Sequence, residues 1–335
     1  MLLHNYGMAR CNGAEMIPQM LMALGAMGGH MGKSGHATGG NYHANAGNYG
    51  PSLVKAGASP NPKTQNPVST GVRQPQMYDL ILNGGGDIVD VSNSYGSFHD
   101  PIPTTLGPIK GIFHVTDATL QTSHHQKMGI EAHRAVDFVL TRAQFMTTNA
   151  MYSDIVLPVT TEWERVGDVT GCNREFVYCY SQVTKPLGEA KTDQEISTLL
   201  LNAMGIDPAL AYGASEKQAF FNKIASTQVM DDGGEMVPLV TITDADIKEW
   251  DVEGSAQEGK ISIKDFVENG GYQFKRTAGD GHGFIGYEDF VTDPEANPLS
   301  SASGKLEIYC QARYNLMKSF GFAGIEQYKP YPTYV

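Results

Sequence analysis

The sequence predicts an α/β fold in which helices flank a parallel sheet and an irregular α+β extension follows. Short apolar runs alternate with segments of helical character, and this alternation favours a parallel α/β sheet. The last of these runs is uniformly apolar and stops at Pro158, as expected of a parallel strand that is buried on both faces. The predicted strands are residues 80–82, 109–115, 135–140 and 155–157.

Five segments have the composition or spacing of helices. Residues 14–27 place apolar side chains three and four positions apart, which predicts a helix with one buried stripe. Pro18 marks its first turn. The other predicted helices are residues 126–134, 146–151, 193–204 and 215–225.

Glycine dominates residues 28–50, so the backbone there must turn sharply or approach another group closely. The segment contains Gly-Lys-Ser, but Met27 stands where a phosphate-binding P-loop requires glycine, and a helix rather than a strand precedes it. This spacing excludes a P-loop. His30, His36 and His43 are loosely spaced, which does not favour metal ligation, because imidazole ligands usually come with matched geometry.

The remaining segments carry weaker patterns. Residues 53–76 form a connector rich in Pro, Ser, Gly and Asn, and the run at 80–82 meets a glycine turn. Residues 231–283 are acidic and punctuated by glycine, which predicts irregular structure around a few helices and strands. Residues 305–309 are predicted to form a strand.

Composition excludes several classes of protein. The 335 residues carry a formal charge of −12 and a sequence pI near 5.2, which argues against a nucleic-acid partner, because such partners favour clustered Lys and Arg. The four cysteines form no C-x-x-C pair, so we predict neither a zinc site nor an iron–sulfur cluster within these residues. No apolar run reaches the roughly 18 residues of a membrane span. We expect a soluble chain without a signal peptide.

The most informative segment is residues 150–168, which read AMYSDIVLPVTTEWERVGD. They join a short helix, an apolar strand and a polar turn, and ligands collect at strand ends in open α/β sheets. We expect the polar side chains of the turn on the ligand side. These are Thr160, Thr161, Glu162, Glu164, Arg165 and Asp168.

This segment resembles the molybdopterin oxidoreductases of the dimethyl sulfoxide reductase family. The family pattern is similar to Thr-Ala-x-x-Ala-Asp-Ile-Val-Leu-Pro-x-x-Thr-x-x-Glu-x-x-Gly. Here the match runs from Asn149 through Pro158 to Thr161, Glu164 and Gly167.

Four further segments carry the resemblance. Residues 7–10 resemble the family's Gly-x-x-Arg turn, and an arginine beside a helix start suits oxyanion or phosphate binding. Residues 28–35 resemble a Thr-Gly-Asn-x-Gly-x-x-Gly turn, with His30 at the usual Asn. Residues 188–193 match Gly-Glu-Ala-x-x-Asp, whose acid can pair with a guanine edge, and residues 287–312 resemble large subunits of anaerobic dimethyl sulfoxide reductases. Considered alone, the acid of the third segment is predicted to be a helix N-cap.

The resemblance implies a subunit that binds Mo-bis(molybdopterin guanine dinucleotide), a cofactor that carries two-electron or oxygen-atom chemistry. It implies reduction of an S-oxide or N-oxide type terminal electron acceptor. It also implies that these residues are a central fragment of a larger multi-domain subunit, inactive in isolation, with a 4Fe-4S cluster only in a missing N-terminal part. The implied partners are an iron–sulfur electron-transfer subunit and a membrane anchor subunit, so the complete enzyme is expected to be periplasmic or membrane-associated.

Three segments are expected within the chain. Residues 1–76 form a helix and a glycine-rich, cofactor-facing segment. Residues 77–206 form a Rossmann-like α/β cofactor-binding domain, and residues 207–335 form an irregular α+β segment that leads to a missing C-terminal domain.

The resemblance assigns roles to individual residues. Arg10 is expected nearest the pterin and the metal and is the catalytic candidate, while Arg165 and Asp193 are expected to hold the nucleotide. The metal's protein ligand is expected upstream, so no metal ligand is assigned here. The cofactor-binding candidates are Tyr6, Gly7, Arg10, Thr119, His124, Arg142, Ala143, Arg165 and Asp193.

The sequence departs from the family pattern at two strand ends. Asp117-Ala118-Thr119 replaces the usual Gly-Asn-Pro, and Ala143 beside Arg142 replaces an Asp that often follows the next strand. These departures leave open a second hypothesis, a non-catalytic cofactor-binding or scaffold relative. A nicotinamide or flavin enzyme is a weaker third, because no G-x-G-x-x-G follows a strand with an acid about twenty residues later.

Overall fold

The computed structural model describes residues 2–4, 16–36, 38–41, 50–65, 71–72, 74–90, 102–115, 118–123, 125–319 and 324–333. The chain folds into two compact units. Unit 1 consists of Met1–Ala58, Val169–Cys179 and Lys223–Val335, and unit 2 consists of Ser59–Asp168 and Tyr180–Asn222. The three-segment organisation expected from the sequence stays a prediction.

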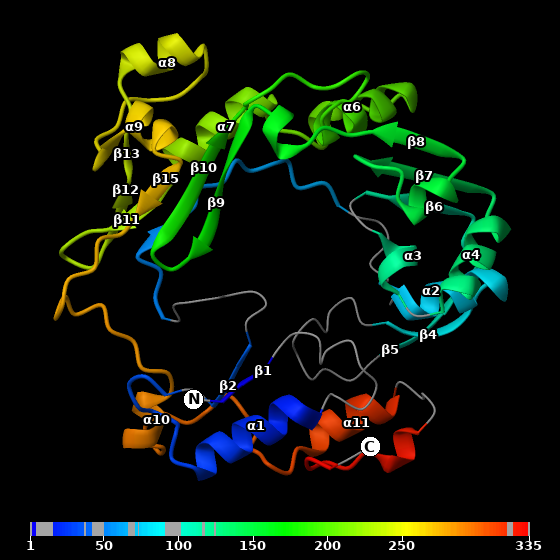
Figure 1. The fold of residues 1–335 in the computed structure, drawn as a ribbon, viewed down its shortest axis with the longest axis vertical. Coiled ribbons are helices and arrows are strands. Elements are labelled where there is room, and N and C mark those ends of the chain that lie inside the picture. The colour runs from blue at the N-terminus through cyan, green and yellow to red at the C-terminus, as the bar shows by residue number, and fades with distance from the viewer. Residues whose placement is uncertain are drawn as a thin grey trace. The chain divides into compact units, whose positions relative to one another are not determined.

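Unit 2 contains a parallel sheet with strands in the order β6-β7-β8 (Figure 1). The strands predicted near 109–115, 135–140 and 155–157 and the helices predicted near 126–134, 146–151, 193–204 and 215–225 are confirmed. A two-stranded antiparallel sheet, β4-β5, precedes them. The elements are α2 (Gln74–Leu82), β4 (Gly86–Asp90), β5 (Ile102–Leu106), β6 (Gly111–His114), α3 (Thr119–Thr122), α4 (Gln126–Ala135), β7 (Phe138–Ala143), α5 (Thr148–Met151), β8 (Ile155–Pro158), η2 (Glu162–Glu164), α6 (Asp193–Ala203) and η3 (Pro208–Leu210).

One face of the parallel sheet packs against helices (Figure 1). Ile112 of β6 pairs with Val139 of β7, so both side chains point to the same face. There they join a buried cluster with residues of α2, α3 and α4. The cluster consists of Tyr78, Ile81, Ile112, Leu120, Ala132 and Val139.

The opposite face of the sheet is more open. Phe113, Leu140 and Ile155 lie in register across the three strands. Leu140 is buried, whereas Phe113 is 50% and Ile155 is 45% exposed. The prediction that residues 155–157 are buried on both faces is therefore wrong, because β8 is an outer strand of this small sheet.

The prediction of a strand at residues 80–82 is also wrong. These residues end the helix α2, and Tyr78 and Ile81 place its apolar stripe in the core. A short apolar run does not distinguish a strand from a buried helix end. The glycine turn follows the helix, and the strand β4 begins only at Gly86.

A buried polar network lies under β6. Asn149, from the family-like segment, accepts a hydrogen bond from the backbone N–H of Leu120 (2.9 Å) and contacts His114 Nδ1 (3.2 Å). His114 and His133 meet through their Nε2 atoms (2.9 Å), and His133 Nδ1 bonds to the carbonyl of Gly129 (2.7 Å). Buried polar groups need such partners, so Asn149 acts here as a structural residue.

Unit 1 is built from small sheets and short helices. The helix predicted at 14–27 is confirmed as α1, with Pro18 in its first turn, and residues 231–283 form the expected mixture of short elements. The elements are β1 (Leu2–His4), α1 (Met16–Met27), β2 (Thr38–Asn41), β3 (Val54–Lys55), β11 (Gln228–Met230), β12 (Met236–Pro238), β13 (Val240–Thr241), α8 (Asp244–Trp250), β14 (Ile261–Ser262), α9 (Ile263–Glu268), β15 (Gly271–Gln273), α10 (Glu288–Thr292), α11 (Gln311–Ser319) and η4 (Ile325–Gln327). The chain passes between the units through β9 (Gly167–Asn173), β10 (Phe176–Ser181) and α7 (Glu216–Ala225).

Residues 305–309 do not form the predicted strand. The carbonyl of Ile308 accepts a hydrogen bond from the Gln19 side chain of α1 (2.8 Å), and the next backbone N–H, at Cys310, donates to the carbonyl of Pro330 (2.6 Å). Isolated bonds to a side chain and to a turn satisfy this backbone in place of a strand ladder.

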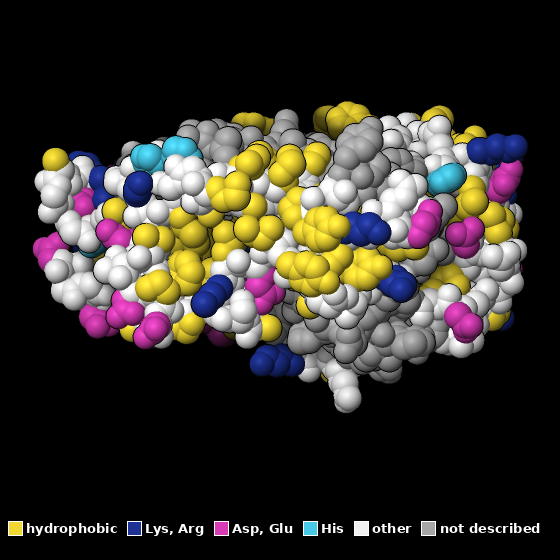
Figure 2. Space-filling view, turned by 90° about the horizontal axis from the view of Figure 1, so that it is seen from below, with side chains coloured by type: hydrophobic (Ala, Val, Ile, Leu, Met, Phe, Trp, Pro, Cys, Tyr) yellow, Lys and Arg dark blue, Asp and Glu magenta, His cyan; other side chains and the backbone are white. Residues whose placement is uncertain are grey.

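Exposed apolar side chains gather on the side of unit 1 where α1 lies (Figure 2). Met20, Leu24 and Met27 of this helix are all exposed. Within the described ranges, none of the helices has the length and apolarity that crossing a membrane requires.

An ion-pair cluster fixes a loop in unit 1. Arg276 pairs with Asp280 through two bonds, Nε to Oδ2 (2.6 Å) and Nη2 to Oδ1 (3.0 Å), and its Nη1 contacts Glu175 Oε1 (2.5 Å). The backbone N–H groups of Thr277 and His282 also donate to Asp280. The hydrogen bond from Arg276 is the largest cause that holds the pKa of Asp280 well below its usual range.

Gly167, the glycine of the family-like segment, has a structural role. Its φ of 143° lies in a region that L side chains rarely adopt. A Cβ there would lie 2.5 Å from the carbonyl oxygen of Tyr180 and 2.6 Å from the ring of Phe220. Only glycine fits where β9 begins.

Replacing Gly167 by alanine tests this constraint. We expect Gly167→Ala to lower the free energy of unfolding by about 2–4 kcal/mol, because backbone strain and overpacking add. Gly188→Ala is the matched control, since Gly188 also has a positive φ, of 58°, but open space around it, and we expect it to cost about 1 kcal/mol. Urea denaturation followed by circular dichroism measures both, and equal losses would contradict the packing constraint.

Acid should weaken the Arg276–Asp280 cluster. Because the folded pKa of Asp280 is depressed, its stabilising contribution is present above the unfolded pKa of about 3.9 and is lost progressively as the pH falls below it. We expect Asp280→Asn to unfold at lower urea concentration than the wild type at neutral pH, with the difference shrinking below about pH 4. The exposed Asp232→Asn is the control, and a difference that stays constant with pH would rule out this cause.

Candidate functional site

The carboxyl ends of β7 and β8 define one edge of the parallel sheet, where ligands of open α/β folds gather. Arg142 lies near the end of β7, and Thr160 follows the end of β8. The segment before α6 runs beside this edge, because Lys191 N–H donates to the carbonyl of Pro158 (3.2 Å) and Thr160 N–H donates to the carbonyl of Lys191 (3.0 Å). These bonds bring the start of α6 to the strand ends.

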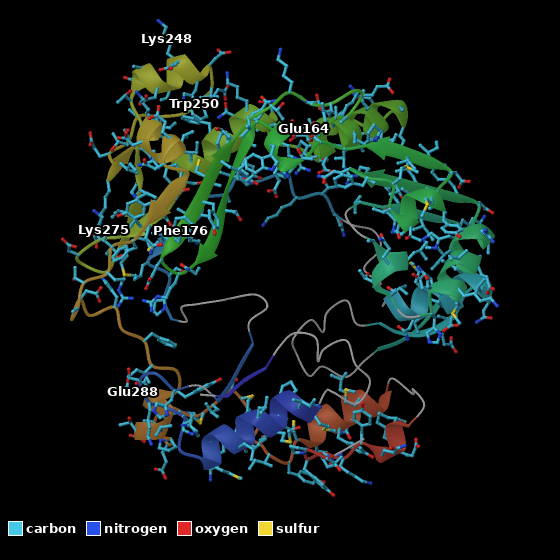
Figure 3. All side chains as sticks on the ribbon, viewed as in Figure 1. Glu164, Phe176, Lys248, Trp250, Lys275 and Glu288 are labelled. Atoms are coloured by element: carbon cyan, nitrogen blue, oxygen red, sulfur yellow. The ribbon has the colours of Figure 1, made fainter. Side chains whose placement is uncertain are left out.

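Glu164 holds the turn after β8 in place (Figure 3). Its buried carboxylate accepts bonds from the backbone N–H of Thr161 (2.7 Å), from the Thr161 hydroxyl (2.9 Å) and from the backbone N–H of Leu187 (2.8 Å). These hydrogen bonds, the one from the Thr161 backbone first, lower the pKa of Glu164 and keep it ionised. The acid of the family-like segment is therefore a structural anchor between residues 161 and 187.

The helix α6 begins with a capping box. Thr192 accepts a bond from the backbone N–H of Glu195 (3.1 Å), and the Glu195 carboxylate accepts one from the backbone N–H of Thr192 (2.8 Å). The prediction that Asp193 is the N-cap is wrong, because the preceding threonine has that position. Asp193 is the first helical residue, and its carboxylate is left for other partners.

Two arginines converge on this carboxylate. Arg142 Nη1 lies 3.1 Å from Asp193 Oδ1, and Arg165 Nη2 lies 3.0 Å from Asp193 Oδ2. Arg142 Nη1 also donates to the carbonyl of Asp193 and to the hydroxyl of Ser197, and Arg165 Nη2 donates to the carbonyl of Thr160. The side chains are 9%, 32% and 40% exposed for Arg142, Arg165 and Asp193. We call these three residues the arginine cluster.

The arginine cluster is incompletely hydrogen-bonded. Arg142 Nε, Arg165 Nε and Thr160 Oγ1 are buried and have no partner in the structure. Buried polar atoms without a partner are uncommon in folded proteins, and each calls for an explanation such as a missing polar ligand.

Further carboxylates surround the cluster. Glu195 follows in the first turn of α6, and Glu216, whose carboxylate bonds to the Thr192 side chain, interacts electrostatically with Glu195, Arg165 and Asp193. Burial raises the pKa of Glu216, and the Thr192 hydrogen bond opposes this change. Two guanidinium groups thus lie among three carboxylates.

An aromatic ring borders the cluster. The guanidinium carbon of Arg142 lies 5.5 Å from the centroid of the Phe113 ring, within the range of a cation–π contact. Phe113 belongs to the open face of the sheet, and half of its surface is accessible. A charged, flat guanidinium and an exposed ring therefore lie beside a carboxylate.

The structure brings together three of the sequence candidates, Arg142, Arg165 and Asp193. Ala143 ends β7, next to Arg142, and Thr119 opens α3 with a buried side chain. The roles of these two in binding stay predictions. Tyr6, Gly7, Arg10 and His124 lie outside the described residues.

Sequence reasoning missed Phe113 and Ser197. Phe113 reads as an ordinary apolar strand residue, and only the strand register places it on the face that Arg142 shares. Ser197 lies four residues into α6 from Asp193, on the same side of the helix. That spacing is the one signal that could have identified it.

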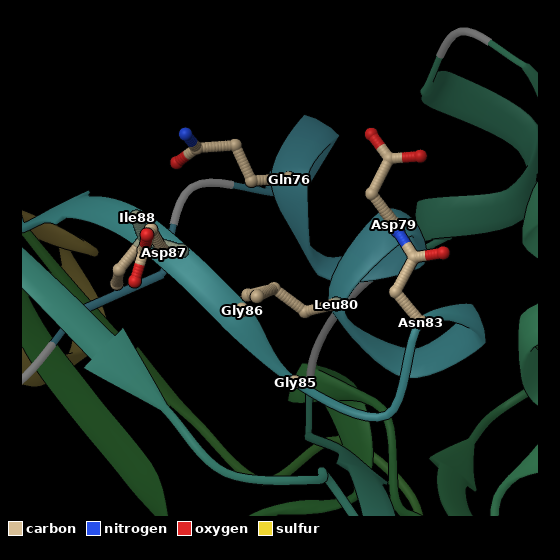
Figure 4. Close-up of a pocket in the computed structure, with 8 residues that line it drawn as sticks. All are labelled: Gln76, Asp79, Leu80, Asn83, Gly85, Gly86, Asp87 and Ile88. Atoms are coloured by element: carbon tan, nitrogen blue, oxygen red, sulfur yellow. The ribbon is translucent and has the colours of Figure 1, made fainter.

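A separate hollow of about 230 Å³ lies where α2 meets β4 (Figure 4). Asp79 and Asn83 of the α2 region and Asp87 of β4 line it, and Asp87 accepts a bond from the Thr105 hydroxyl (2.6 Å). None of its lining residues belongs to the arginine cluster. In the part of the chain that the structure describes, no three His, Cys, Asp or Glu residues are grouped to hold a metal ion.

Comparison with known proteins identifies the family. The family model described as molybdopterin oxidoreductase matches residues 6–203. The chain is 24% identical to the dimethyl sulfoxide reductase DmsA of Escherichia coli (strain K12), over 82% of this chain and 30% of the relative. It is also 24% identical to the dimethyl sulfoxide/trimethylamine N-oxide reductase of Cereibacter sphaeroides, over 72% of this chain and 26% of the relative.

A solved structure, the acetylene hydratase from Pelobacter acetylenicus, is 17% identical with a TM-score of 0.40, covering 78% of this chain and 26% of that chain. The chain thus spans less than a third of the length of the relatives that it matches. Because the family model covers more than half of the 335 residues, the chain belongs to the molybdopterin oxidoreductase family, with relatives among the dimethyl sulfoxide reductases.

Proposed function

We propose that this chain is part of a catalytic subunit that binds Mo-bis(molybdopterin guanine dinucleotide), and that the arginine cluster contacts the nucleotide end of the cofactor. Family membership implies an oxidoreductase with a molybdenum–pterin cofactor. The observation that carries the finer proposal is the convergence of Arg142 and Arg165 on Asp193 at the carboxyl ends of β7 and β8. Nucleotides bind at this edge of open α/β sheets.

The residues present fit a nucleotide. The cluster offers a carboxylate acceptor that is 40% exposed and guanidinium donors beside it, and three buried polar atoms still lack partners. A guanine edge presents both donors and acceptors. The donor set is therefore complementary to the group that the family resemblance implies.

Each residue has a defined task in this proposal. Glu164 fixes the turn that carries Arg165, the capping box of α6 presents Asp193, and the two arginines hold its carboxylate in one orientation. Arg10 is proposed to lie nearest the pterin and the metal, with Tyr6, Gly7, Thr119, His124 and Ala143 as further contacts to the cofactor. When bound, the cofactor supplies two-electron or oxygen-atom chemistry, and the protein supplies position and electrostatics.

The substrate proposed for the complete enzyme is an S-oxide or N-oxide terminal electron acceptor. The names of two relatives, which specify dimethyl sulfoxide and trimethylamine N-oxide, support this class. We further propose an iron–sulfur electron-transfer subunit and a membrane anchor subunit as partners, with a 4Fe-4S cluster in an N-terminal part of the complete subunit. The complete enzyme would then be periplasmic or membrane-associated.

A non-catalytic cofactor-binding or scaffold relative is the second candidate. It is favoured by the carboxylate of Asp193, both oxygens of which already contact arginines. A cofactor must share this acid with two internal partners. Cofactor content separates the two candidates.

Replacing Asp193 tests the nucleotide site. The chain and its Asp193→Asn variant are purified from cells that make the cofactor, and molybdenum is measured by mass spectrometry and guanine nucleotide by acid release. We expect both to co-purify with the wild type and to fall about tenfold in the variant, because an interaction between a charged acceptor and its donors is lost. Glu189→Gln removes an exposed carboxylate from the same segment and should retain both. A wild type without molybdenum and guanine nucleotide would favour the scaffold.

The isolated chain is expected to be inactive. The 335 residues are mixed with a reduced viologen donor and either dimethyl sulfoxide or trimethylamine N-oxide, with a dimethyl sulfoxide reductase of known activity as the positive control. We expect no donor oxidation above the protein-free blank, because the chain corresponds to under a third of its relatives and no metal ligand is assigned in it. Turnover by the isolated chain would overturn this proposal.

A further inference from the structure

Arg142 is the most deeply buried member of the arginine cluster, with a side chain that is 9% exposed. Its contacts to Asp193 and Ser197 all come from one atom, Nη1. Its Nε is buried without a partner, and its Nη2 makes no hydrogen bond to the described residues. A buried guanidinium normally uses more of its five donors, so part of this fork is left for a ligand.

The charges around Arg142 select against a free anion. Asp193, Glu195 and Glu216 outnumber the guanidinium groups of Arg142 and Arg165. A phosphate placed here would meet three carboxylates, and like charges in a partly buried site repel strongly. The site suits a neutral ligand that carries both hydrogen-bond donors and acceptors.

The pairing of a carboxylate with a guanidinium matches one nucleobase. Guanine carries an N1–H and an N2 amino group as neighbouring donors, next to the acceptors O6 and N7, and arginine is the usual partner of O6 and N7. Adenine lacks the N1–H donor and places an amino group where guanine has O6. Asp193 and Arg142, joined at 3.1 Å, therefore complement adjacent parts of a guanine edge.

The ring of Phe113 supplies a surface for stacking. It lies 5.5 Å from the guanidinium carbon of Arg142, on the open face of the sheet, and is half exposed. Nucleobases stack on aromatic rings and on guanidinium planes. Stacking and edge recognition can thus act on one base at the same place.

We propose that Arg142 is a specificity-determining residue that reads the O6 and N7 acceptors of a guanine base while Asp193 accepts from its N1–H and N2 amino group. The assignment rests on the proposed function and deepens it. It makes Arg142 a recognition residue in its own right, in addition to a holder of Asp193. The Arg142–Asp193 pair selects guanine, and Phe113 supports the plane of the base.

Nucleotide analogues test the assignment on the unmodified chain. Binding of guanosine, inosine and 7-deazaguanosine monophosphates and of inorganic phosphate is measured by titration calorimetry at millimolar concentration. Inosine lacks the N2 amino group, and 7-deazaguanosine lacks N7. We expect each analogue to bind about tenfold more weakly than guanosine monophosphate, because each loses a hydrogen bond to a charged group, and phosphate to compete poorly. Equal affinity for all three nucleotides, no binding of guanosine monophosphate, or equally good competition by phosphate would overturn the proposal.

Variants then separate recognition from folding. We expect Arg142→Gln to weaken guanosine monophosphate binding about tenfold and to abolish the preference over 7-deazaguanosine, while the preference over inosine remains. Arg142→Lys keeps the charge but not the planar fork, so it should also lose the N7 preference. Arg134→Gln is the matched control, because Arg134 also lies over an aromatic ring, that of Tyr152 at 5.3 Å. Thermal melting checks that each variant is folded, and retained N7 preference in folded Arg142→Gln would refute the assignment.

The molybdenum content keeps the two proposals apart. If wild-type protein from cofactor-producing cells carries molybdenum but shows no preference among the analogues, the assignment of Arg142 fails and the proposed function stands. If it shows the preference but carries no molybdenum, the proposed function fails and the guanine subsite stands.

Discussion

The buried carboxylate of Glu164 is the constraint on which the candidate site depends. It joins the turn after β8 to the segment before α6 through bonds to Thr161 and Leu187. Because these donors lower its pKa, the carboxylate stays ionised over the ordinary pH range and the constraint does not titrate away. Arg165, next to Glu164 in the sequence, and Asp193, six residues after Leu187, meet as a consequence.

The ion pairs of the arginine cluster contribute little to the stability of the fold. Asp193 and Arg165 are partly exposed, and pairs of that kind typically contribute about 0–1 kcal/mol. Arg142 is different, since it is nearly buried and a buried charge without a partner is strongly destabilising. Asp193 therefore compensates Arg142, while backbone pairing at Pro158 and Lys191 determines where they meet.

Two arginine clusters in the molecule show the difference between a structural role and a binding role. In unit 1, all three guanidinium nitrogens of Arg276 have carboxylate partners at 2.5–3.0 Å, so this group is complete and fixes a loop. In unit 2, Arg142 and Arg165 share one carboxylate, and the Nε atom of each is unsatisfied. An incomplete set of bonds is what distinguishes a site that awaits a ligand from a finished structural contact.

The sequence by itself determined the family, the parallel strands β6, β7 and β8, and the helices α1, α4, α5, α6 and α7, because periodicity and the motif around Asn149 to Gly167 are local signals. It also named Arg142, Arg165 and Asp193. Only the tertiary structure decided that residues 80–82 end a helix, that β8 is an outer strand, and that residues 305–309 lack a ladder. These outcomes depend on which neighbours each segment meets. The convergence of Arg142, Arg165 and Phe113 around Asp193 was decided in the same way, since it follows from strand register and from contacts between residues far apart in the sequence.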